Sequence, residues 1–308
     1  MLDAILLSLV GLVGLAVGGE LLVRGAVGIA GKLGVSTLFT GLVIVGFATS
    51  MPEMVASIQA SLAGSPEIAW GNIVGSNLAN TLLILGATAL VTPIALGGRG
   101  RRDGAIALGV TLVLWGLALA QVGAPLIGLV LLMGIIAYIA YSYRFPGPPE
   151  ESGVEDEAKP SWAKALSLFI GGLVVLVLGG NALVSGAIDL ATLLGVSETV
   201  IGLTVVAVGT SLPELAASIA AALRGKSALA IGNVVGSNIY NILLIGGATM
   251  SIAPFALPYS LHTTGQMGLL TASAVVLLAL LWFAKSINRV IGAVLLAGFT
   301  ANVVLVFA

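Results

Sequence analysis

One stretch of the chain occurs twice, and each copy carries a single carboxylate in the middle of an apolar segment. The first copy reads GLVIVGFATSMPEMVAS and then GNIVGSNLANTLLILGAT; the second reads GLTVVAVGTSLPELAAS and then GNVVGSNIYNILLIGGAT. Equivalent positions, such as Glu53 and Glu214, lie 161 residues apart in both parts of the copy. A polar pattern repeated within lipid-soluble sequence predicts two structural repeats with a polar site where they meet.

The composition places these repeats in a membrane. Apolar residues make up 58% of the 308 residues and charged residues only 8%, far below the roughly 25% charge of a soluble domain. Several apolar runs reach the roughly 20 residues that cross a bilayer. The net charge of −1 and the lack of a basic stripe exclude nucleic-acid binding. The chain has no cysteine, which excludes disulfides and thiolate ligands.

Apolar runs separated by Gly, Pro and charged clusters predict an all-α integral membrane protein with ten transmembrane helices. The ten spans are expected at 3–28, 36–62, 68–92, 104–121, 124–143, 162–188, 197–222, 228–252, 266–284 and 287–307. Five spans fall in each repeat, and an odd number makes the second repeat enter the membrane from the opposite side. We therefore expect two inverted five-helix repeats at 1–143 and 162–308, joined by a linker at 144–161.

Basic residues predict the orientation, because Lys and Arg in short loops stay on the cytoplasmic side. They fall at connections on one face of the ten-span arrangement: Lys32, Arg99, Arg101, Arg102, Arg144, Lys159, Lys164, Arg224, Lys226, Lys285 and Arg289. The linker, with five acidic residues, reads as a solvated cytoplasmic segment. Both termini are then expected outside, in a multi-pass protein of the plasma membrane. Arg24 lies within the first span, where we expect a structural pair with Glu20.

The segment around each carboxylate predicts a kinked or broken helix. Pro52 lacks an N–H and its ring crowds the preceding turn, so the carbonyl of Ala48 loses its helical partner; Pro213 acts alike in the second copy. Inside a membrane, such backbone is tolerated only where it lines a cavity. Thr49 and Glu53 are four residues apart on one helix face, so hydroxyl, carbonyl and carboxylate oxygens can converge there. Hard cations such as Ca²⁺ and Na⁺ prefer this oxygen-only set.

A second polar surface follows each carboxylate segment. Asn and Ser recur every four residues and form a stripe along one helix side: Asn72, Ser76 and Asn80 in the first copy, with Asn233, Ser237 and Asn241 in the second. Glycines at the small-xxx-small spacing let this helix approach the broken one closely. Amide and hydroxyl oxygens of the stripe are expected to complete a cation shell without adding charge.

The polar residues and glycines of the repeated motif have other interpretations besides a cation site. Asn, Ser and Gly-xxx-Gly patterns often only join membrane helices, but an ionised group at mid-bilayer is costly and is by default a functional candidate. A passive cation channel is an alternative, although channels usually build a filter from identical subunits around an axis. An intramembrane hydrolase finds no support, because neither H-E-x-x-H nor G-x-S-x-G occurs and the single histidine, His262, falls in a loop.

The motifs GTSLPE and GNVVGSN closely resemble the alpha-repeat signature of the sodium/calcium exchanger family, within the cation/calcium antiporter superfamily. ATSMPE and GNIVGSN match it nearly as well, so the resemblance covers both repeats, in the compact prokaryotic form. It implies a ten-span inverted-repeat fold and an antiporter that exchanges Ca²⁺ for several Na⁺ at one central cluster of sites. We expect alternating access in the lipid bilayer, a functional monomer, no cofactor and no enzymatic activity.

The resemblance also implies roles for residues at matching motif positions. It implies that Glu53 and Glu214 are the carboxylates shared by Ca²⁺ and Na⁺. The other ligands that it implies supply hydroxyl, amide or backbone oxygens: Thr49, Ser50, Ser76, Asn80 and the Gly46 carbonyl, with Thr210, Ser211, Ser237, Asn241 and the Ala207 carbonyl.

Three residues bear on which ions are exchanged. Some relatives, including potassium-dependent exchangers, have Asp at the position of Asn241, so the amide here weakens the case for K⁺ transport. Proton/calcium antiporters usually carry an acid in place of the Ser of GSN, so Ser76 and Ser237 favour Na⁺ over H⁺. An H⁺/Ca²⁺ antiporter and a K⁺-dependent Na⁺/Ca²⁺ antiporter are the alternatives to Na⁺/Ca²⁺ exchange.

Overall fold

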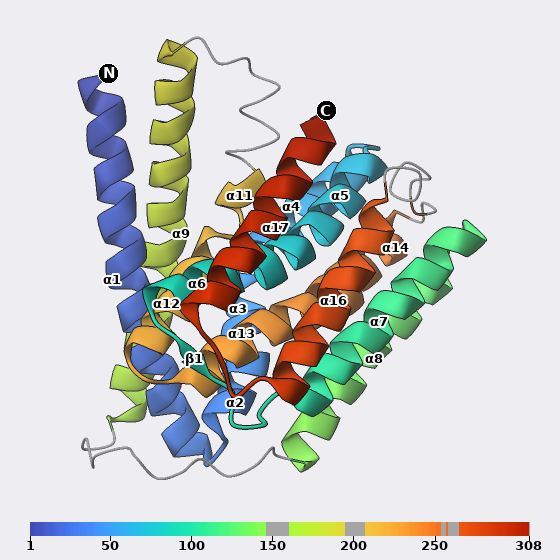
Figure 1. The fold of residues 1–308 in the computed structure, drawn as a ribbon, viewed down its shortest axis with the longest axis horizontal. Helices are drawn as coiled ribbons and strands as arrows, with labels where there is room; N and C mark the ends of the chain where they lie inside the picture. Colours follow the sequence, from blue (N-terminus) through green and yellow to red (C-terminus); the bar gives the residue numbers. More distant parts are fainter. Residues whose placement is uncertain (146–159, 195–206, 254–256, 258–264, 308) are drawn as a thin grey trace.

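Apolar helices make up most of the structure. The computed structural model describes residues 1–145, 160–194, 207–253, 257 and 265–307 (Figure 1). The continuous long helices are α1 (Leu2–Leu33), α7 (Arg101–Ala120), α8 (Pro125–Arg144), α9 (Trp162–Leu193), α16 (Gln266–Phe283) and α17 (Arg289–Phe307). The segments that carry the repeated motifs are divided into α2 (Thr37–Phe39), η1 (Thr40–Val45), α3 (Gly46–Thr49), α4 (Met51–Leu62), α5 (Pro66–Leu78), η2 (Ala79–Ile84), α6 (Leu85–Val91), α11 (Ala207–Gly209), α12 (Leu212–Leu223), α13 (Ser227–Tyr240), η4 (Asn241–Gly246) and α14 (Gly247–Ile252).

Seven of the described helices are long and apolar enough to cross a membrane, and the bent pair Thr37–Thr49 with Met51–Leu62 raises the number to eight. Two predicted spans are not among these helices. The apolar part of α17, Arg289–Leu305, falls short of the required length, and only the second part of 197–222 is described; most of the linker and His262 also lie outside the described residues. The chain is a multi-pass helical membrane protein, while ten spans and inverted repeats stay predictions.

One small element departs from the all-α prediction. β1 (Ile94–Ala95) and β2 (Ser286–Ile287) pair antiparallel, with Ile94 opposite Ile287. Both isoleucines are fully buried. A pair of two-residue strands has no alternating pattern that a sequence could reveal, so its partners are set by the packing around them. The pairing joins the connector after α6 to the connector before α17.

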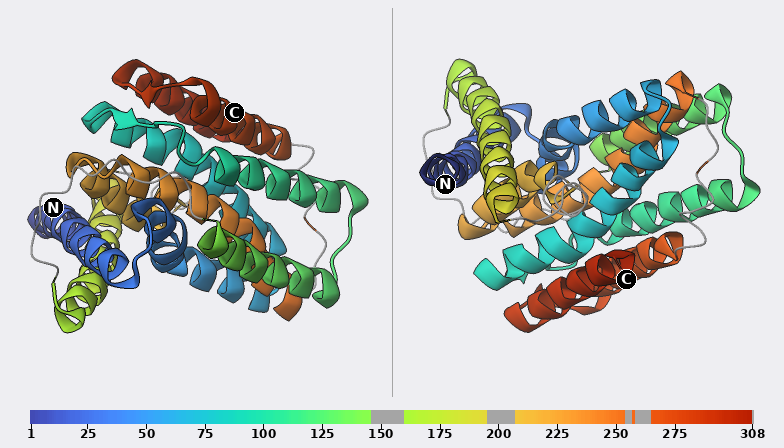
Figure 2. Two further views of the ribbon diagram at one scale, coloured as in Figure 1. Left: turned by 90° about the horizontal axis from the view of Figure 1, so that it is seen from below. Right: turned by 90° about the horizontal axis from the view of Figure 1, so that it is seen from above.

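The helices form an inner and an outer layer (Figure 2). In the inner segments Ser227–Ile252 and Pro66–Val91, 94% and 78% of the apolar window is buried, whereas the other five spanning helices reach at most 33%. The outer helices expose large apolar side chains such as Leu126 and Met133. Such exposure is stable when the surroundings are lipid. The polar motifs on the inner segments are therefore buried within the protein and do not face the bilayer.

α1 and α9 pack against each other at one edge of the molecule (Figures 1 and 2). Glycines bring their backbones together, because a Cβ on Gly25 would lie 2.3 Å from Phe169 N and one on Gly172 would lie 2.3 Å from Leu22 N. A larger residue at either glycine would force the helices apart. The two helices form one antiparallel unit, called the α1–α9 pair below.

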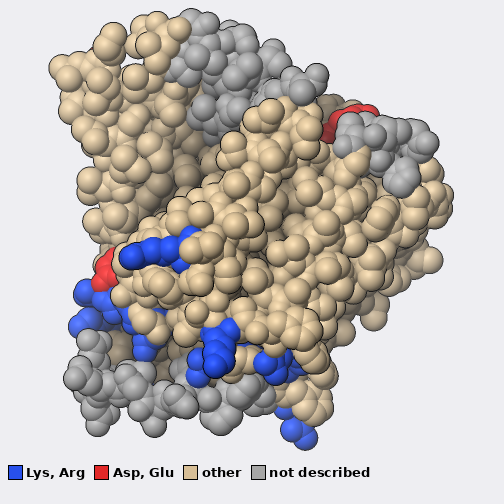
Figure 3. Space-filling model, in the orientation of Figure 1, with Lys and Arg blue, Asp and Glu red and all other residues tan. Residues whose placement is uncertain are grey.

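Lys and Arg side chains gather in the lower half of the molecule in Figure 3. They lie at the last turns of α1 and α8 and at the starts of α7, α9 and α13, with Lys32, Arg102, Arg144, Lys164 and Lys226 among them. We call this end of the helices the basic end. The N- and C-termini lie at the opposite end, called the far end (Figure 1).

Candidate functional site

Both carboxylates lie just after a break in a membrane helix. α3 ends at Thr49, Ser50 has φ −81° and ψ 4°, and α4 begins at Met51, with a bend of 44° between the two parts. The second copy breaks alike, since Ser211 has φ −91° and ψ 6° immediately before α12. Proline in the first turn of α4 and α12 is compatible with a helix start but not with a helix interior. The predicted kink is thus present at both positions.

Each carboxylate is held by a serine from the other copy of the motif. Ser211 Oγ donates to Glu53 Oε1 at 3.1 Å, and Ser50 Oγ donates to Glu214 Oε1 at 3.2 Å. Each glutamate is only 2% exposed. Because each serine is three residues from the glutamate of its own copy, this crossing brings both breaks and both carboxylates into one buried centre.

The asparagines that begin the polar stripe hold backbone. Asn72 Nδ2 donates to the Glu53 carbonyl at 3.1 Å, and Asn233 Nδ2 donates to the Glu214 carbonyl at 3.2 Å. Asn72 also donates to Ser57 Oγ at 2.9 Å, and Asn233 does the same to Ser218 Oγ at 2.9 Å. These amides therefore hold the first turn of α4 and of α12, and the expectation that oxygens of the stripe join a cation shell stays a prediction.

Several buried oxygens of the two carboxylates and of the polar stripes have no hydrogen-bond donor among the described residues. They are one oxygen of each carboxylate, two amide oxygens and one hydroxyl: Glu53 Oε2, Glu214 Oε2, Asn80 Oδ1, Asn241 Oδ1 and Ser237 Oγ. A buried acceptor left without a partner costs about 1–3 kcal/mol, and a charged one costs more. A cation among these oxygens would satisfy them together.

The remaining predicted ligands lie on the same elements. Thr49 is fully buried, with Oγ1 at 3.1 Å from the Val45 carbonyl and 3.2 Å from Asn233 Oδ1. Ser76 is buried in α5. Thr210 is partly exposed in the turn between α11 and α12, while Gly46 and Ala207 begin α3 and α11.

The polar stripes are interrupted by π-helical turns that the sequence did not predict. η2 begins at Ala79 and η4 begins at Asn241, so Asn80 and Asn241 both lie in a widened turn. A third such turn, η1, precedes the break before Glu53. Single π turns occur frequently at functional sites in proteins. No residue type marks them here.

The donor set selects the class of cation. Within the described part of the chain, no three residues of the types His, Cys, Asp and Glu come together as a metal cluster. The centre offers two carboxylates with neutral hydroxyl and amide oxygens, which suits hard cations such as Ca²⁺ and Na⁺ and not metals that need nitrogen or sulfur ligands.

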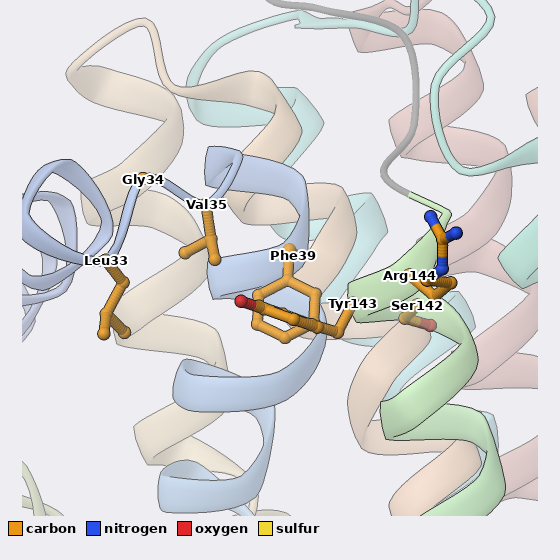
Figure 4. A pocket seen from close by; sticks show the side chains of 7 residues that line it. All are labelled: Leu33, Gly34, Val35, Phe39, Ser142, Tyr143 and Arg144. Atoms are coloured by element: carbon orange, nitrogen blue, oxygen red, sulfur yellow. The ribbon is translucent and has the colours of Figure 1, made fainter.

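A separate surface hollow of about 350 Å³ lies between the end of α1 and the end of α8. Figure 4 shows Phe39 and Tyr143 side by side at its centre, with Leu33, Gly34 and Val35 beside them. Neither carboxylate lines it. The hollow surrounds the connection from α1 to α2 and is not the cation centre.

A multi-pass helical bundle with a buried, duplicated oxygen centre defines a cation transporter of the membrane. The chain matches the family described as sodium/calcium exchanger protein over residues 4–144 and 164–308. It is 33% identical to sodium/calcium exchanger MaX1 of Methanosarcina acetivorans over 344 aligned residues, with 98% of each chain covered. It is also 30% identical to the inner membrane protein YrbG of Escherichia coli, over 97% of this chain and 95% of that protein.

The fold is shared with a solved exchanger. The structure superposes on that of the sodium-calcium exchanger NCX_Mj soaked without Na⁺ and Ca²⁺ with a TM-score of 0.84, at 30% identity and over 98% of each chain. This protein therefore belongs to the sodium/calcium exchanger family, as its repeated motifs predict, and is a cation antiporter of the membrane.

Proposed function

We propose that this protein exchanges Na⁺ for Ca²⁺ by alternating access at one site shared by the two repeats. The observation that carries the proposal is the crossed pair of serine–glutamate bonds around carboxylate oxygens that have no donor. Two ionised carboxylates buried together are unfavourable unless a cation lies between them, because each has lost its hydration. Glu53 and Glu214 supply the charge.

The neutral ligands set the ion class in this proposal. Asn80, Asn241 and Ser237 present unpaired oxygens, and Thr49, Ser50, Ser76, Thr210 and Ser211, with the Gly46 and Ala207 carbonyls, complete the shell. Two formal negative charges match one Ca²⁺ or two Na⁺. If more than two Na⁺ replace one Ca²⁺, the cycle moves net charge, and turnover then responds to membrane potential at about 2.3 kcal/mol per elementary charge per 100 mV.

The proposed architecture is a functional monomer of ten spans, with inverted repeats at 1–143 and 162–308 and a linker at 144–161. The matched hydrogen bonds around the two breaks support the repeat relation. The basic end is cytoplasmic and both termini lie outside the plasma membrane, because basic residues remain on the cytoplasmic side. Alternating access then exposes the one site first to one side and then to the other.

The test is Ca²⁺ uptake into proteoliposomes loaded in turn with Na⁺, with K⁺ or with a proton gradient. Uptake driven by internal Na⁺ alone, and absent from the Glu53→Gln variant, supports the proposal. Uptake that requires K⁺ together with Na⁺ assigns a potassium-dependent exchanger, and uptake driven by protons assigns an H⁺/Ca²⁺ antiporter. If Ca²⁺ flux needs no counter-ion, the protein is a passive channel and the proposal of ion exchange is overturned.

A further inference from the structure

An ion pair outside the cation centre connects the α1–α9 pair to the inner helices. Arg224, which directly follows α12, donates from Nε to Glu20 Oε2 at 2.7 Å and from its terminal nitrogen to Glu20 Oε1. Arg24 Nε donates to the same carboxylate at 2.8 Å from one turn further along α1. The pairing with Arg224 uses two parallel bonds, the most specific geometry for an arginine and a carboxylate. The sequence predicted only the pair within α1.

A short connector joins the α1–α9 pair to the inner helices at the basic end. α1 ends at Leu33, and Gly34 follows in the left-handed conformation with φ 67°. Three residues separate α1 from α2, and the first two, Gly34 and Val35, line the hollow of Figure 4. Because glycine adopts this conformation without strain and has open space around it, the connector can change angle while the tightly packed α1–α9 pair moves as one unit.

The α1–α9 pair packs unequally against the two broken helices. α1 lies on α12, where a Cβ on Gly19 would be 2.9 Å from the Ala216 carbonyl, and Val23 and Ala26 are fully buried. The equivalent residues of α9, Val184 and Ala187, are partly exposed. Among the described residues, α9 makes no comparable packing with α4. The α1–α9 pair therefore lies on α12 and not on α4, and this arrangement is called closed at the basic end below.

The residues of the ion pair have no counterpart in the other repeat. At the repeat offset, Glu20 corresponds to Asn181, and Arg224 corresponds to Ala63. Asn181 and Ala63 are both exposed and uncharged. A conformation in which α9 packs on α4 would bring these two positions toward each other without an ion pair. The chain thus has a charge pair available in one of the two repeat-related arrangements only.

We propose that Glu20 and Arg224 form a one-sided latch that favours the conformation closed at the basic end. A bidentate ion pair that is present in one of two arrangements and absent from the other shifts the population toward the first. The latch opens when the α1–α9 pair moves from α12 toward α4. This inference rests on the proposed alternating access, and it concerns two residues that lie outside the predicted ligand set.

The experiment measures distances between spin labels in the absence of Na⁺ and Ca²⁺. The chain has no cysteine, so labels can be attached at introduced cysteines alone. Exposed positions serve as sites: Leu33→Cys with Leu223→Cys reports the basic end, and Leu62→Cys with Leu193→Cys reports the far end. In the Glu20→Gln variant, the fraction of molecules with a longer distance at the basic end is expected to rise about five-fold. This corresponds to a loss of roughly 1 kcal/mol from the free energy that favours the closed conformation.

Matched variants separate a latch from a general loss of structure. Arg24→Gln removes a bond within α1 only, so the populations are expected to stay as in the parent. The charge-reversed double variant Glu20→Arg with Arg224→Glu is expected to restore the parent distribution. Asn181→Glu with Ala63→Arg leaves the latch intact and adds its mirror image, so it is expected to raise the open fraction at the basic end. Unchanged distances in Glu20→Gln and in the mirror variant overturn the proposal.

Ca²⁺ binding measured on the same samples distinguishes failure of the latch from failure of the proposed function. If the parent protein binds Ca²⁺ and the Glu20→Gln variant shows unchanged distances, the latch is refuted and the proposed function is not. Parent protein that binds no Ca²⁺ refutes the proposed function, and the distances still report whether Glu20 and Arg224 hold the α1–α9 pair on α12.

Discussion

The two copies of the motif are alike at the carboxylates and unlike at the helices that surround them. Asn72 and Asn233 make the same two hydrogen bonds, with lengths that agree within 0.1 Å. Glu20, in contrast, is paired across elements, while its equivalent Asn181 is exposed. In the proposed alternating access, a site that faces both sides of the membrane in turn needs equivalent ligands from both repeats. The relative population of the two proposed orientations would then be set by residues outside the site.

The helices that carry the polar stripes differ between the two copies at one polar position. Asn238 Nδ2 donates to Thr81 Oγ1 at 3.1 Å, across the two repeats. The equivalent of Thr81 is Ile242, which has no hydroxyl, and Asn77 instead donates to the Ile73 carbonyl of its own helix at 2.8 Å. Equivalent asparagines therefore have different partners, which shows where the two repeats have diverged within the buried region.

The largest effect is expected at the carboxylates. Glu53→Gln and Glu214→Gln should each reduce Ca²⁺ exchange by about a hundred-fold or more, because each removes half the negative charge from a low-dielectric site. The loss of Ca²⁺ exchange should be similar in the two variants, because Glu53 and Glu214 have similar hydrogen-bonding environments. Proteoliposome flux is the measurement, with Glu67→Gln in the exposed first turn of α5 as the control. A parental rate in either variant contradicts a shared site.

The next effect is expected at the asparagines that hold the broken helices. Asn72→Ala and Asn233→Ala each leave a buried hydroxyl and carbonyl without a donor, at about 1–3 kcal/mol for each group. Ca²⁺ affinity should fall about ten-fold, and further in Asn233→Ala because Asn233 also contacts Thr49. Titration calorimetry checks this, with Asn302→Ala in α17 as a matched control. Equal affinities in all three variants would show that the bonds do not position the site.

A smaller effect on stability is expected within the α1–α9 pair. Gly25→Ala places a methyl group 2.3 Å from Phe169 N and should lower the free energy of unfolding by about 1–3 kcal/mol. Gly31→Ala, on the same helix with no atom within 4 Å, should be neutral or stabilising by roughly 0.5–1 kcal/mol. Thermal unfolding in detergent measures both. Similar melting temperatures for the two variants would contradict the close packing of α1 on α9.

The smallest effect is expected at the amide oxygens. Asn241→Asp adds a third carboxylate at a buried position with an unpaired oxygen, and Asn80→Asp does so at the equivalent position. Each should add a several-fold dependence of Na⁺-driven Ca²⁺ flux on K⁺ or on pH, because the extra charge attracts another monovalent cation or a proton. Flux is measured across both titrations. If neither variant responds, or the parent already needs K⁺, these amides do not face the ions.

Much of the fold could be predicted from the sequence, because the apolar runs and repeated motifs are long. The predicted kinks after Thr49 and Thr210 are present, since Pro52 and Pro213 act on the local backbone. Family membership was predicted from the motifs and is confirmed. The cation-ligand roles of the site residues stay predictions, supported by the crossed hydrogen bonds between the serines and glutamates of the two copies.

Other features depend on contacts between distant parts of the chain and could not be predicted. The bond from Ser211 to Glu53 joins residues 158 positions apart, and the bond from Arg224 to Glu20 joins residues 204 apart. The direction of the Asn72 amide depends on Ser57 and on the Glu53 carbonyl in the neighbouring helix. Periodicity reveals which residues share a helix face but not which group of a side chain faces a neighbour.

The central claim is that the two repeats build one cation site, and equilibrium binding of Ca²⁺ tests it most directly. The purified chain should bind one Ca²⁺ with Glu53 and Glu214 acting together, and Na⁺ should displace it. Either single Glu→Gln substitution should then remove all of the binding. Binding of two Ca²⁺ per chain, with half of the binding kept in each single variant, would show two independent sites and contradict the account.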